Sequence, residues 1–418
     1  MPMRGRRSGV CAPLGCVPVD MAGRMQGLFN EGAYAMAEKA ANLERQGRHV
    51  VHLEIGQPDF ATPSHVVKAG VDALEAGNTR YTAPSGTAAL RSAVAAHVAA
   101  TRGVTVRPDE VVVGPGAKPG LFFAALALLD KGDEMVYPDP GFPTYRNMAL
   151  ISGARPVPVP LNPEGTSFSM DALRDSISSR TKLVVLNSPS NPTGGVMPQE
   201  DVDEVARLAV AHDFWVLSDE IYARLVYGDD GGEERGSCPS ILAVPGMRDR
   251  VILVDGFSKT YAMTGWRLGW AVMPEALAKK VELLLVHSVG CTASFTQAAA
   301  LAALQGPQDD AESMRAEFRA RRDLVVSGLN AMPGVSCATP RGAFYAFPDI
   351  SAYGIPSSDL ADLLLEKGGV AVLAGTAFGV NGEGHLRLSY VCDRDTLREG
   401  LDRIAKVLST LPLKGAGT

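Results

Sequence analysis

The fold is decided by Val251-Ile252-Leu253-Val254-Asp255-Gly256-Phe257-Ser258-Lys259, which continues as Thr260-Tyr261-Ala262-Met263-Thr264-Gly265-Trp266-Arg267. A lysine is ordinarily a solvated surface charge, but Lys259 follows an apolar run and lies among small, aromatic and hydroxyl residues. An amine at the end of a buried strand suits carbonyl chemistry if its pKa is lowered, because only the neutral amine forms an imine. Arg267 adds a rigid guanidinium fork that suits a phosphate. The stretch therefore points to pyridoxal phosphate (PLP).

Size and composition fit an ordinary soluble enzyme. The chain has 418 residues, of which 46 % are hydrophobic and 21 % charged, so it is long enough for a large core and two domains. A net charge of −6 gives no support to nucleic-acid binding as the main role. The sequence has no run of about 18 apolar residues, and we predict no membrane span.

The six cysteines show neither zinc-type pairing nor the density of a secreted scaffold. Cys11 and Cys16 have no second pair to complete a metal site, so we predict no metal and a reducing cytoplasmic location. Residues 1–25, which include Arg4, Arg6 and Arg7, are predicted to be a poorly ordered extension.

Short apolar runs alternate with helical segments up to about residue 300. Because nearly all-apolar strands between helices are typical of buried parallel sheets, we predict a mostly parallel sheet covered on both faces. Such sheets bind ligands beyond the carboxyl ends of their strands. The predicted strands are Val111–Val113, Met135–Tyr137, Leu183–Leu186, Phe214–Leu217, Val251–Val254 and Leu268–Val272, and the helices Leu90–Ala100, Leu121–Leu129, Glu200–His212 and Glu275–Leu285.

The two ends of the chain are predicted to form a smaller α+β domain. A helix at Ala33–Arg45 and a strand at Val50–Ile55 precede the alternating region. From Ala311 onward a long charged helix leads to short strands, including Leu386–Tyr390, and a final helix. We place the N-terminal joining segment at 26–60, the large domain at 61–300 and the small domain at 301–418.

A glycine-rich loop, Gly114-Pro115-Gly116-Ala117-Lys118-Pro119-Gly120, follows one strand and begins a helix. Backbone N–H groups at a helix N-terminus suit a phosphate. The loop lacks the Gly-Lys-Ser/Thr of a Walker loop and is one residue too long for the dinucleotide fingerprint. Asp139, after the next strand, could imitate a ribose-binding acid. By itself the loop is therefore equally compatible with a nucleotide and with another phosphate ligand.

Asp219 follows a strand in Ser218-Asp219-Glu220-Ile221-Tyr222. The ordinary interpretation of such an acid is a helix N-cap. The functional interpretation is a partner for the pyridine nitrogen of PLP, because a buried carboxylate keeps that nitrogen protonated and the ring able to accept electrons. Tyr222 then lies within reach of the ring's phenolic oxygen.

Three further side chains are candidates for the same site. Asn191, in a turn typical of Asn-Pro and Gly-Gly pairs, is a possible donor to the phenolic oxygen. Phe142 is either a core residue or a stacking partner for a planar cofactor. Arg387, on the polar face of a strand, is either a solvated surface residue or a bidentate hydrogen-bond partner for a substrate carboxylate.

Together these motifs resemble class I aminotransferases of the aspartate aminotransferase family, which are fold-type I PLP enzymes. The resemblance runs from about residue 30 to the C-terminus and rests on Asn191-Pro192-Thr193-Gly194, Asp219-Glu220-Ile221-Tyr222, Ser258-Lys259-Thr260, Gly265-Trp266-Arg267 and Arg387. It implies an α/β fold: a large domain with a mostly parallel seven-stranded sheet flanked by helices, plus a smaller α+β domain.

The resemblance also implies a role for each candidate residue. Lys259 forms the internal aldimine and moves the proton, Asp219 pairs with the pyridine nitrogen, Asn191 and Tyr222 bind the phenolic oxygen, and Phe142 stacks on the ring. Gly116, Ala117 and Lys118 cradle the phosphate, mostly through backbone groups, with Arg267 as its charged partner, while Arg387 binds the substrate α-carboxylate beside the backbone of Gly56. Tyr81 matches a tyrosine that reaches the phosphate of the neighbouring subunit, which implies a homodimer.

Two departures from the family pattern stand out. Many relatives carry a serine where this chain has Gly256, and Ser258 is the candidate to replace its phosphate contact. Dicarboxylate-specific relatives carry another arginine for the distal carboxylate, but Ser288–Ser294 contains none. Strict aspartate specificity is therefore not predicted.

The predicted function is transfer of the amino group of an L-amino acid to a 2-oxo acid, with ping-pong kinetics. A second hypothesis keeps PLP but ends in elimination, replacement, cyclisation or oxidation, since the same lysine serves all of these. A third is a non-catalytic regulator, which would ordinarily need an added DNA-binding domain. A nicotinamide enzyme fails on the spacing of the glycine loop and leaves Lys259 without a role.

Overall fold

The predicted apolar runs form one seven-stranded sheet in the computed structural model, which describes residues 21–25, 27–28, 30–228 and 237–414. The strand order is β2-β8-β7-β6-β5-β3-β4, and every pair is parallel except the two that involve β8. The mostly parallel sheet is thus confirmed. Predictions for residues 1–20, including Cys11 and Cys16, lie outside the described residues.

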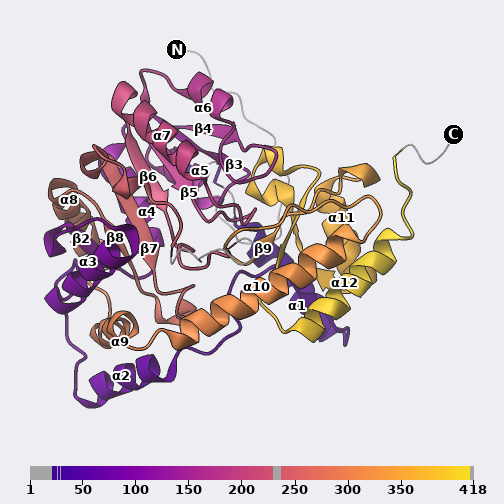
Figure 1. Ribbon diagram of the computed structural model, residues 1–418, viewed down its shortest axis with the longest axis horizontal. Helices are drawn as coiled ribbons and strands as arrows, with labels where there is room; N and C mark the ends of the chain where they lie inside the picture. The colour runs from indigo at the N-terminus through magenta and orange to yellow at the C-terminus, as the bar shows by residue number, and fades with distance from the viewer. Residues whose placement is uncertain (1–20, 26, 29, 229–236, 415–418) are drawn as a thin grey trace, which may run out of the picture.

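Helices flank this sheet, as Figure 1 shows. Its strands are β2 (Val111–Gly114), β3 (Glu134–Asp139), β4 (Arg155–Pro160), β5 (Thr181–Asn187), β6 (Trp215–Asp219), β7 (Val251–Gly256) and β8 (Gly269–Val272). The helices of this part are α2 (Ser64–Glu75), α3 (Ala88–Arg102), α4 (Lys118–Leu128), α5 (Thr144–Ile151), α6 (Met170–Ser176), α7 (Gln199–His212), α8 (Glu275–Val286) and α9 (Ser294–Gln305).

Both faces of the sheet are buried, because alternate residues of one strand enter different cores. On β7, Val251 and Leu253 belong to one hydrophobic cluster, whereas Ile252 and Val254 belong to another. Side chains of successive strand residues point to opposite faces. The near-continuous apolar runs therefore reflect burial from two sides.

One strand of the sheet was missed by the sequence reasoning. Strand β4 reads Arg-Pro-Val-Pro-Val-Pro, and proline argues against a strand because it donates no ladder hydrogen bond. The structure places β4 at the edge of the sheet, paired only with β3. An edge strand leaves one row of backbone groups unpaired, so the prolines are accommodated.

The remaining elements build a second lobe around its own hydrophobic cluster (Figure 1). They are α1 (Gly32–Arg45), β1 (Val51–His52), α10 (Asp309–Asn330), β9 (Tyr345–Ala346), α11 (Ser357–Leu363), β10 (Val370–Ala371), β11 (Leu373–Ala374), β12 (Leu386–Ser389) and α12 (Arg394–Leu408). Strand β1 pairs with β10, while β11, β12 and β9 form an antiparallel sheet. The domain boundaries stay predictions.

Strand β1 is shorter than the predicted Val50–Ile55. Beyond His52 the backbone turns to partners of β12: Leu53 O accepts from the backbone N–H of Ser389 at 2.8 Å, and Glu54 O accepts from the guanidinium of Arg387. Leu53 still donates to Ala371 O of β10 at 2.9 Å, so the pairing with β10 ends after this residue.

A buried ionic cluster ties the sheet to α3. Arg102 donates from Nε to Glu220 at 3.1 Å and from Nη2 to Asp255 at 2.6 Å. Glu220 also accepts from the hydroxyls of Ser218 at 2.9 Å and Ser240 at 2.6 Å. Burial alone would lower the pKa of Arg102, but the two carboxylates raise it. The cluster fixes the chain where it leaves β6 and β7.

We expect Arg102→Met to lower the free energy of unfolding of the cofactor-free protein by about 3–5 kcal/mol, because it leaves two buried carboxylates without a cation. Urea unfolding measures the loss. Arg91, on the same helix, pairs with the exposed Asp109, so Arg91→Met is the matched control with a loss within about 1 kcal/mol. Equal losses in the two variants would contradict the role of the buried cluster.

Candidate active site

The predicted catalytic residues meet at the carboxyl edge of the sheet. In the register of the parallel strands, Asn187 of β5 lies opposite Asp219 of β6, which lies opposite Val254 of β7. Lys259 is in the turn that follows β7. Because neighbouring parallel strands end at one edge, residues far apart in sequence converge there.

Lys259 lies among aromatic rings and cations. Its Nζ donates to Gly56 O at 2.5 Å and lies 5.8 Å and 5.6 Å from the ring centroids of Tyr222 and Phe344. Burial is the main cause that lowers the pKa of Lys259 to about 8, and nearby positive charges act in the same direction. These charges belong to Arg387, Arg267 and Lys118. The amine is therefore neutral far more often than that of a free lysine.

Asp219 is buried and held by two donors. Its Oδ2 accepts from the hydroxyl of Tyr145 at 2.8 Å and its Oδ1 from the backbone N–H of Ile221 at 3.3 Å. Burial raises the pKa of Asp219 to about 6, while these hydrogen bonds act in the opposite direction. The sequence reasoning gave Tyr145 no role, because no local pattern links it to Asp219.

Arg387 is buried, so the solvated interpretation is wrong. Its guanidinium carbon lies 4.5 Å from the ring centroid of Tyr345 and 5.1 Å from that of Phe378. Nη1 donates to Asn191 Oδ1 at 3.4 Å, and Nη2 to Glu54 O. The Nε atom has no hydrogen-bond partner among the described residues. A buried donor without an acceptor is suited to an anionic ligand.

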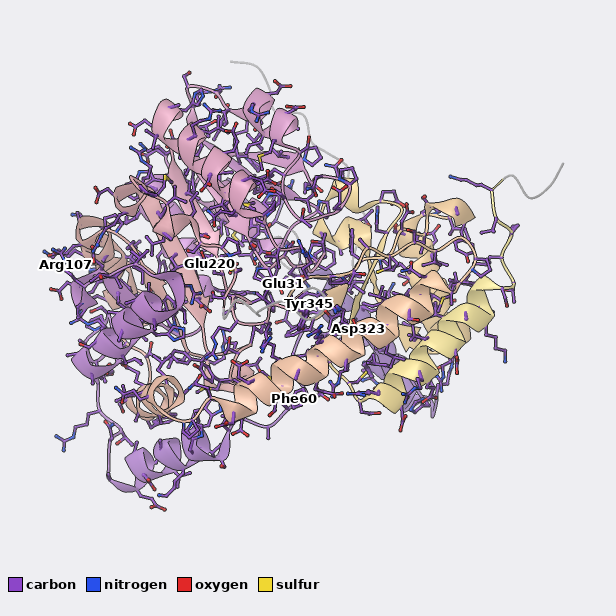
Figure 2. The ribbon with its side chains drawn as sticks, in the orientation of Figure 1. Glu31, Phe60, Arg107, Glu220, Asp323 and Tyr345 are labelled. Carbon is purple, nitrogen blue, oxygen red and sulfur yellow. The ribbon has the colours of Figure 1, made fainter. Side chains whose placement is uncertain are left out.

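Two tyrosines complete the space around Lys259. The hydroxyls of Tyr222 and Tyr345 are 2.7 Å apart, and either one is able to donate. The Tyr345 hydroxyl also occupies the space that a side chain at Gly56 would need. Only glycine therefore fits at Gly56. Figure 2 places Tyr345 between the two lobes.

The glycine loop and Arg267 form a compact phosphate-sized corner. Gly116 has φ +93°, and a Cβ there would collide with the guanidinium of Arg267. Arg267 donates to Thr264 O at 3.0 Å and to Pro115 O at 3.4 Å. Ala117 is the residue before α4, whose first backbone N–H groups have no partner within the helix.

The predicted backbone role of Lys118 in the phosphate cradle stays a prediction, and its side chain has other partners. Its ammonium forms an ion pair with Glu31 of the other lobe and lies 5.3 Å from the ring centroid of Phe142. The side chain is thus engaged with a carboxylate, which leaves its backbone for the loop. Glu31 had no signal in the sequence because it lies far from every motif.

Two predicted residues lie apart from these contacts. Ser258 is buried beside Lys259, and none of the described hydrogen bonds involves its side chain. Tyr81 is 96 % exposed on the single chain. The structure thus brings Lys259, Asp219, Tyr222, Asn191 and Arg387 together and leaves Tyr81 on the surface.

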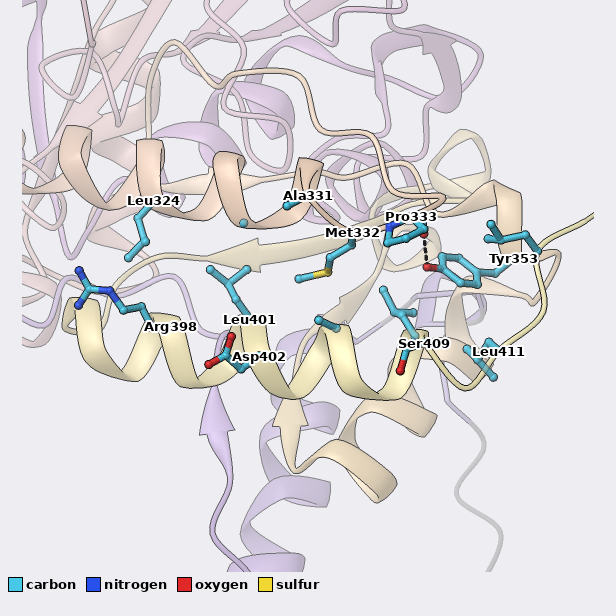
Figure 3. A pocket seen from close by; sticks show the side chains of 14 residues that line it. Leu324, Ala331, Met332, Pro333, Tyr353, Arg398, Leu401, Asp402, Ser409 and Leu411 are labelled. Carbon is cyan, nitrogen blue, oxygen red and sulfur yellow. Dashed lines mark hydrogen bonds between the residues drawn. The ribbon is translucent and has the colours of Figure 1, made fainter.

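A separate groove of about 710 Å³ lies in the second lobe, between α10 and α12 (Figure 3). Leu324, Met332 and Leu401 line it, and the Tyr353 hydroxyl donates to Pro333 O at 2.5 Å at one end. None of the predicted site residues lines this groove, so it is distinct from the candidate active site.

The sheet, with a lysine, a carboxylate and arginines at its carboxyl edge, has the architecture of fold-type I PLP-dependent enzymes. The residues fit that cofactor on three observations: an amine of lowered pKa, a buried carboxylate, and a buried guanidinium with a free donor. The glycine corner beside Arg267 suits its phosphate.

Comparison with known proteins identifies the family. The profile of the family "Aminotransferase class I and II" matches residues 48–404. The chain is 38 % identical to an aspartate aminotransferase of Pyrococcus horikoshii, covering 89 % of this chain and 93 % of that relative. It is 39 % identical to an arginine–pyruvate transaminase of Pseudomonas aeruginosa, with 91 % and 96 % covered.

Solved structures agree with the sequence matches. The crystal structure of an aspartate aminotransferase from Rhizobium meliloti has a TM-score of 0.89 at 36 % identity, covering 94 % of this chain and 100 % of that one. The chain therefore belongs to the class I and II aminotransferases, which confirms amino-group transfer and PLP dependence.

We expect the Asp219 carboxyl to weaken the cofactor-free fold as pH rises. A carboxyl whose pKa is raised from 3.8 to about 6 on folding holds its proton more tightly in the folded state, so stability falls between those values. In urea unfolding, wild type should therefore lose about 2–3 kcal/mol more than Asp219→Asn between about pH 4 and about pH 7.5.

Two further variants make this measurement specific. Asp171 is exposed on α6, so Asp171→Asn should follow the wild-type pH profile. Tyr145→Phe removes a donor to Asp219 and should steepen the loss with pH. Parallel profiles for wild type and Asp219→Asn would contradict a raised pKa at this carboxyl.

Proposed function

We propose that Lys259 holds the cofactor covalently and is the general base of this aminotransferase. The observation that supports this most strongly is the Lys259 amine itself, which lies deep in the site with a pKa lowered to about 8. A pKa one unit above neutrality leaves roughly a tenth of the amine uncharged at pH 7, against a negligible fraction for a free lysine. An uncharged amine is what imine formation and proton removal both require.

We propose the remaining roles from the family resemblance. Asp219 holds the protonated pyridine nitrogen, Asn191 and Tyr222 bind the phenolic oxygen, and Phe142 stacks on the ring. Gly116, Ala117, Lys118 and Ser258 surround the phosphate with Arg267 as its charged partner, and Arg387 with the backbone of Gly56 receives the α-carboxylate. For Lys118 we assign the backbone rather than the ammonium, since Glu31 holds the latter.

PLP, when bound, supplies a carbonyl for the amino group and a ring that accepts the electrons released at Cα. The protein's own residues arrange the rest. Arg387 uses its free Nε donor to fix the α-carboxylate, which sets the orientation of Cα. Lys259 Nζ, as a neutral amine, would take the Cα proton. Asp219 would hold the positive charge of the ring nitrogen.

We expect the rate of PLP capture by the cofactor-free protein to rise with pH through about 8 and then level off, because the neutral Lys259 amine is the reacting form. Stopped-flow absorbance of the visible imine band measures this rate. Below the pKa of Lys259 the amine is charged and unreactive, so the capture rate is low there and increases as the amine loses its proton.

The variant Lys259→Ala tests whether Lys259 holds PLP covalently and acts as the general base. It should bind PLP without the visible band and lose amino-group transfer by at least about 10⁴-fold, since both covalent binding and proton transfer are lost. Lys279, an exposed lysine on α8, provides the control variant Lys279→Ala with unchanged capture. Capture by Lys259→Ala at the wild-type rate would disprove the role of Lys259.

We further propose a homodimer in which Tyr81 reaches the phosphate of the neighbouring site. Tyr81 is fully exposed on the single chain, and three residues of the preceding helix α2 form an exposed apolar stripe. Val67, Val71 and Leu74 lie at helical spacing and are 39–46 % exposed. Apolar stripes of this kind are typical of subunit interfaces.

Shared sites make a distinctive prediction for mixed dimers. If Tyr81→Ala and Lys259→Ala subunits are co-expressed with different affinity tags, doubly tagged dimers hold both defects in one site and none in the other. Such dimers should recover about half of the wild-type turnover, because a two-fold axis gives two equivalent sites. Sites built from one chain would each keep one defect, and the mixed dimers would then show only half of the residual turnover of the Tyr81→Ala dimer.

Location and domain limits also remain proposals. We propose a cytoplasmic protein, which rests on the cysteine pattern of the sequence, and domains bounded at 60/61 and 300/301. Within the described residues no helix is both long enough and apolar enough to cross a membrane.

A further inference from the structure

An ion pair bridges the two lobes at the edge of the candidate site. Glu31 is the residue that precedes α1, and Lys118 is the first residue of α4. Their side chains form a direct ion pair, with 25 % and 49 % of their surfaces exposed. Neither residue has a structural task in a hydrophobic core, so the pair is free to respond to what enters the site.

The charges of the pair act on the residues around Lys259. The charge of Glu31 acts on both Arg387 and Tyr345, and the charge of Lys118 acts on Lys259. Figure 2 places Glu31 next to Tyr345 between the lobes. A substrate anchored by its α-carboxylate at Arg387, with Cα at Lys259, therefore extends its side chain into the field of this pair.

Charge balance decides which side chain suits that space. Arg387, Arg267 and Lys118 supply three positive charges, against a dianionic phosphate, a substrate carboxylate and Glu31. Asp219 is balanced separately by the protonated ring nitrogen. The filled site thus has one negative charge in excess, and Glu31 takes up the ammonium of Lys118 that could otherwise offset it. A distal carboxylate would add a second one, whereas a distal cation would neutralise it.

We propose that Glu31 determines donor specificity: its carboxylate occupies the ammonium of Lys118, disfavours donors with a distal carboxylate and favours donors with a distal cation such as a guanidinium. This inference rests on the proposed function, because it uses Arg387 as the anchor of the α-carboxylate. It assigns a role to Glu31, for which the sequence predicted none, and to Lys118, for which the sequence predicted only phosphate binding.

Unreactive ligands of different charge test the inference on the PLP-loaded protein. Succinate, butyrate and γ-guanidinobutyrate each carry one carboxylate for Arg387 and end in a negative, neutral or positive group. They lack an α-amino group, so isothermal calorimetry reports binding alone. In wild type we expect γ-guanidinobutyrate to bind more tightly than butyrate, and succinate to gain nothing over butyrate.

Two variants of the pair should shift these affinities in opposite directions. Glu31→Gln frees Lys118, so the affinity of succinate relative to butyrate should rise about tenfold and the advantage of γ-guanidinobutyrate should fall about tenfold. Lys118→Gln leaves Glu31 without its cation, so the preference for γ-guanidinobutyrate should increase. Glu38 is exposed on α1, the helix that Glu31 precedes. Glu38→Gln should keep the order of the three affinities that wild type shows.

The outcomes separate this inference from the function beneath it. If Glu31→Gln binds the three ligands in the wild-type ratios while the protein still transfers amino groups, the specificity role is overturned and the proposed function stands. If the wild-type protein shows no visible PLP band and binds none of the three ligands, the proposed function fails, and this inference fails with it.

Discussion

The register of β5, β6 and β7 is the constraint on which the site depends. It sets Asn187 opposite Asp219 and Asp219 opposite Val254, so three connections leave the sheet at one level. Asn187 strengthens the alignment by donating from Nδ2 to Asp219 O at 3.1 Å. A slip of one residue would turn Asp219 to the opposite face of the sheet and place an apolar neighbour in the site. Two-sided burial of alternating apolar residues makes such a slip costly.

The second requirement is control of buried charge around that edge. The carboxylates of Asp255 and Glu220 both act to raise the pKa of Asp219, in addition to its burial. Arg102 binds both carboxylates directly and offsets part of their charge. An arginine from α3 is therefore buried where it limits the rise in the pKa of Asp219, which favours the ionised form that a ring cation needs.

The sequence predicted those parts of the molecule that local patterns encode. Apolar runs identified six strands of the large sheet because burial from both sides leaves few polar residues in them. Strand β4 was missed because its prolines are tolerated only at an edge, and edge position is a tertiary property. The burial of Arg387 and the Tyr145–Asp219 hydrogen bond were equally out of reach. They depend on which elements pack together, which neither spacing nor residue type reveals.

The relatives show why specificity has to be sought away from the sheet edge. One is named for aspartate and another for arginine, yet both match this chain over about nine tenths of its length. Residues that serve the transfer step itself do not distinguish one donor side chain from another. Discrimination must come from groups that meet only the distal end of the donor. In this chain we infer that position for Glu31 and Lys118, because their ion pair joins residues from the two lobes.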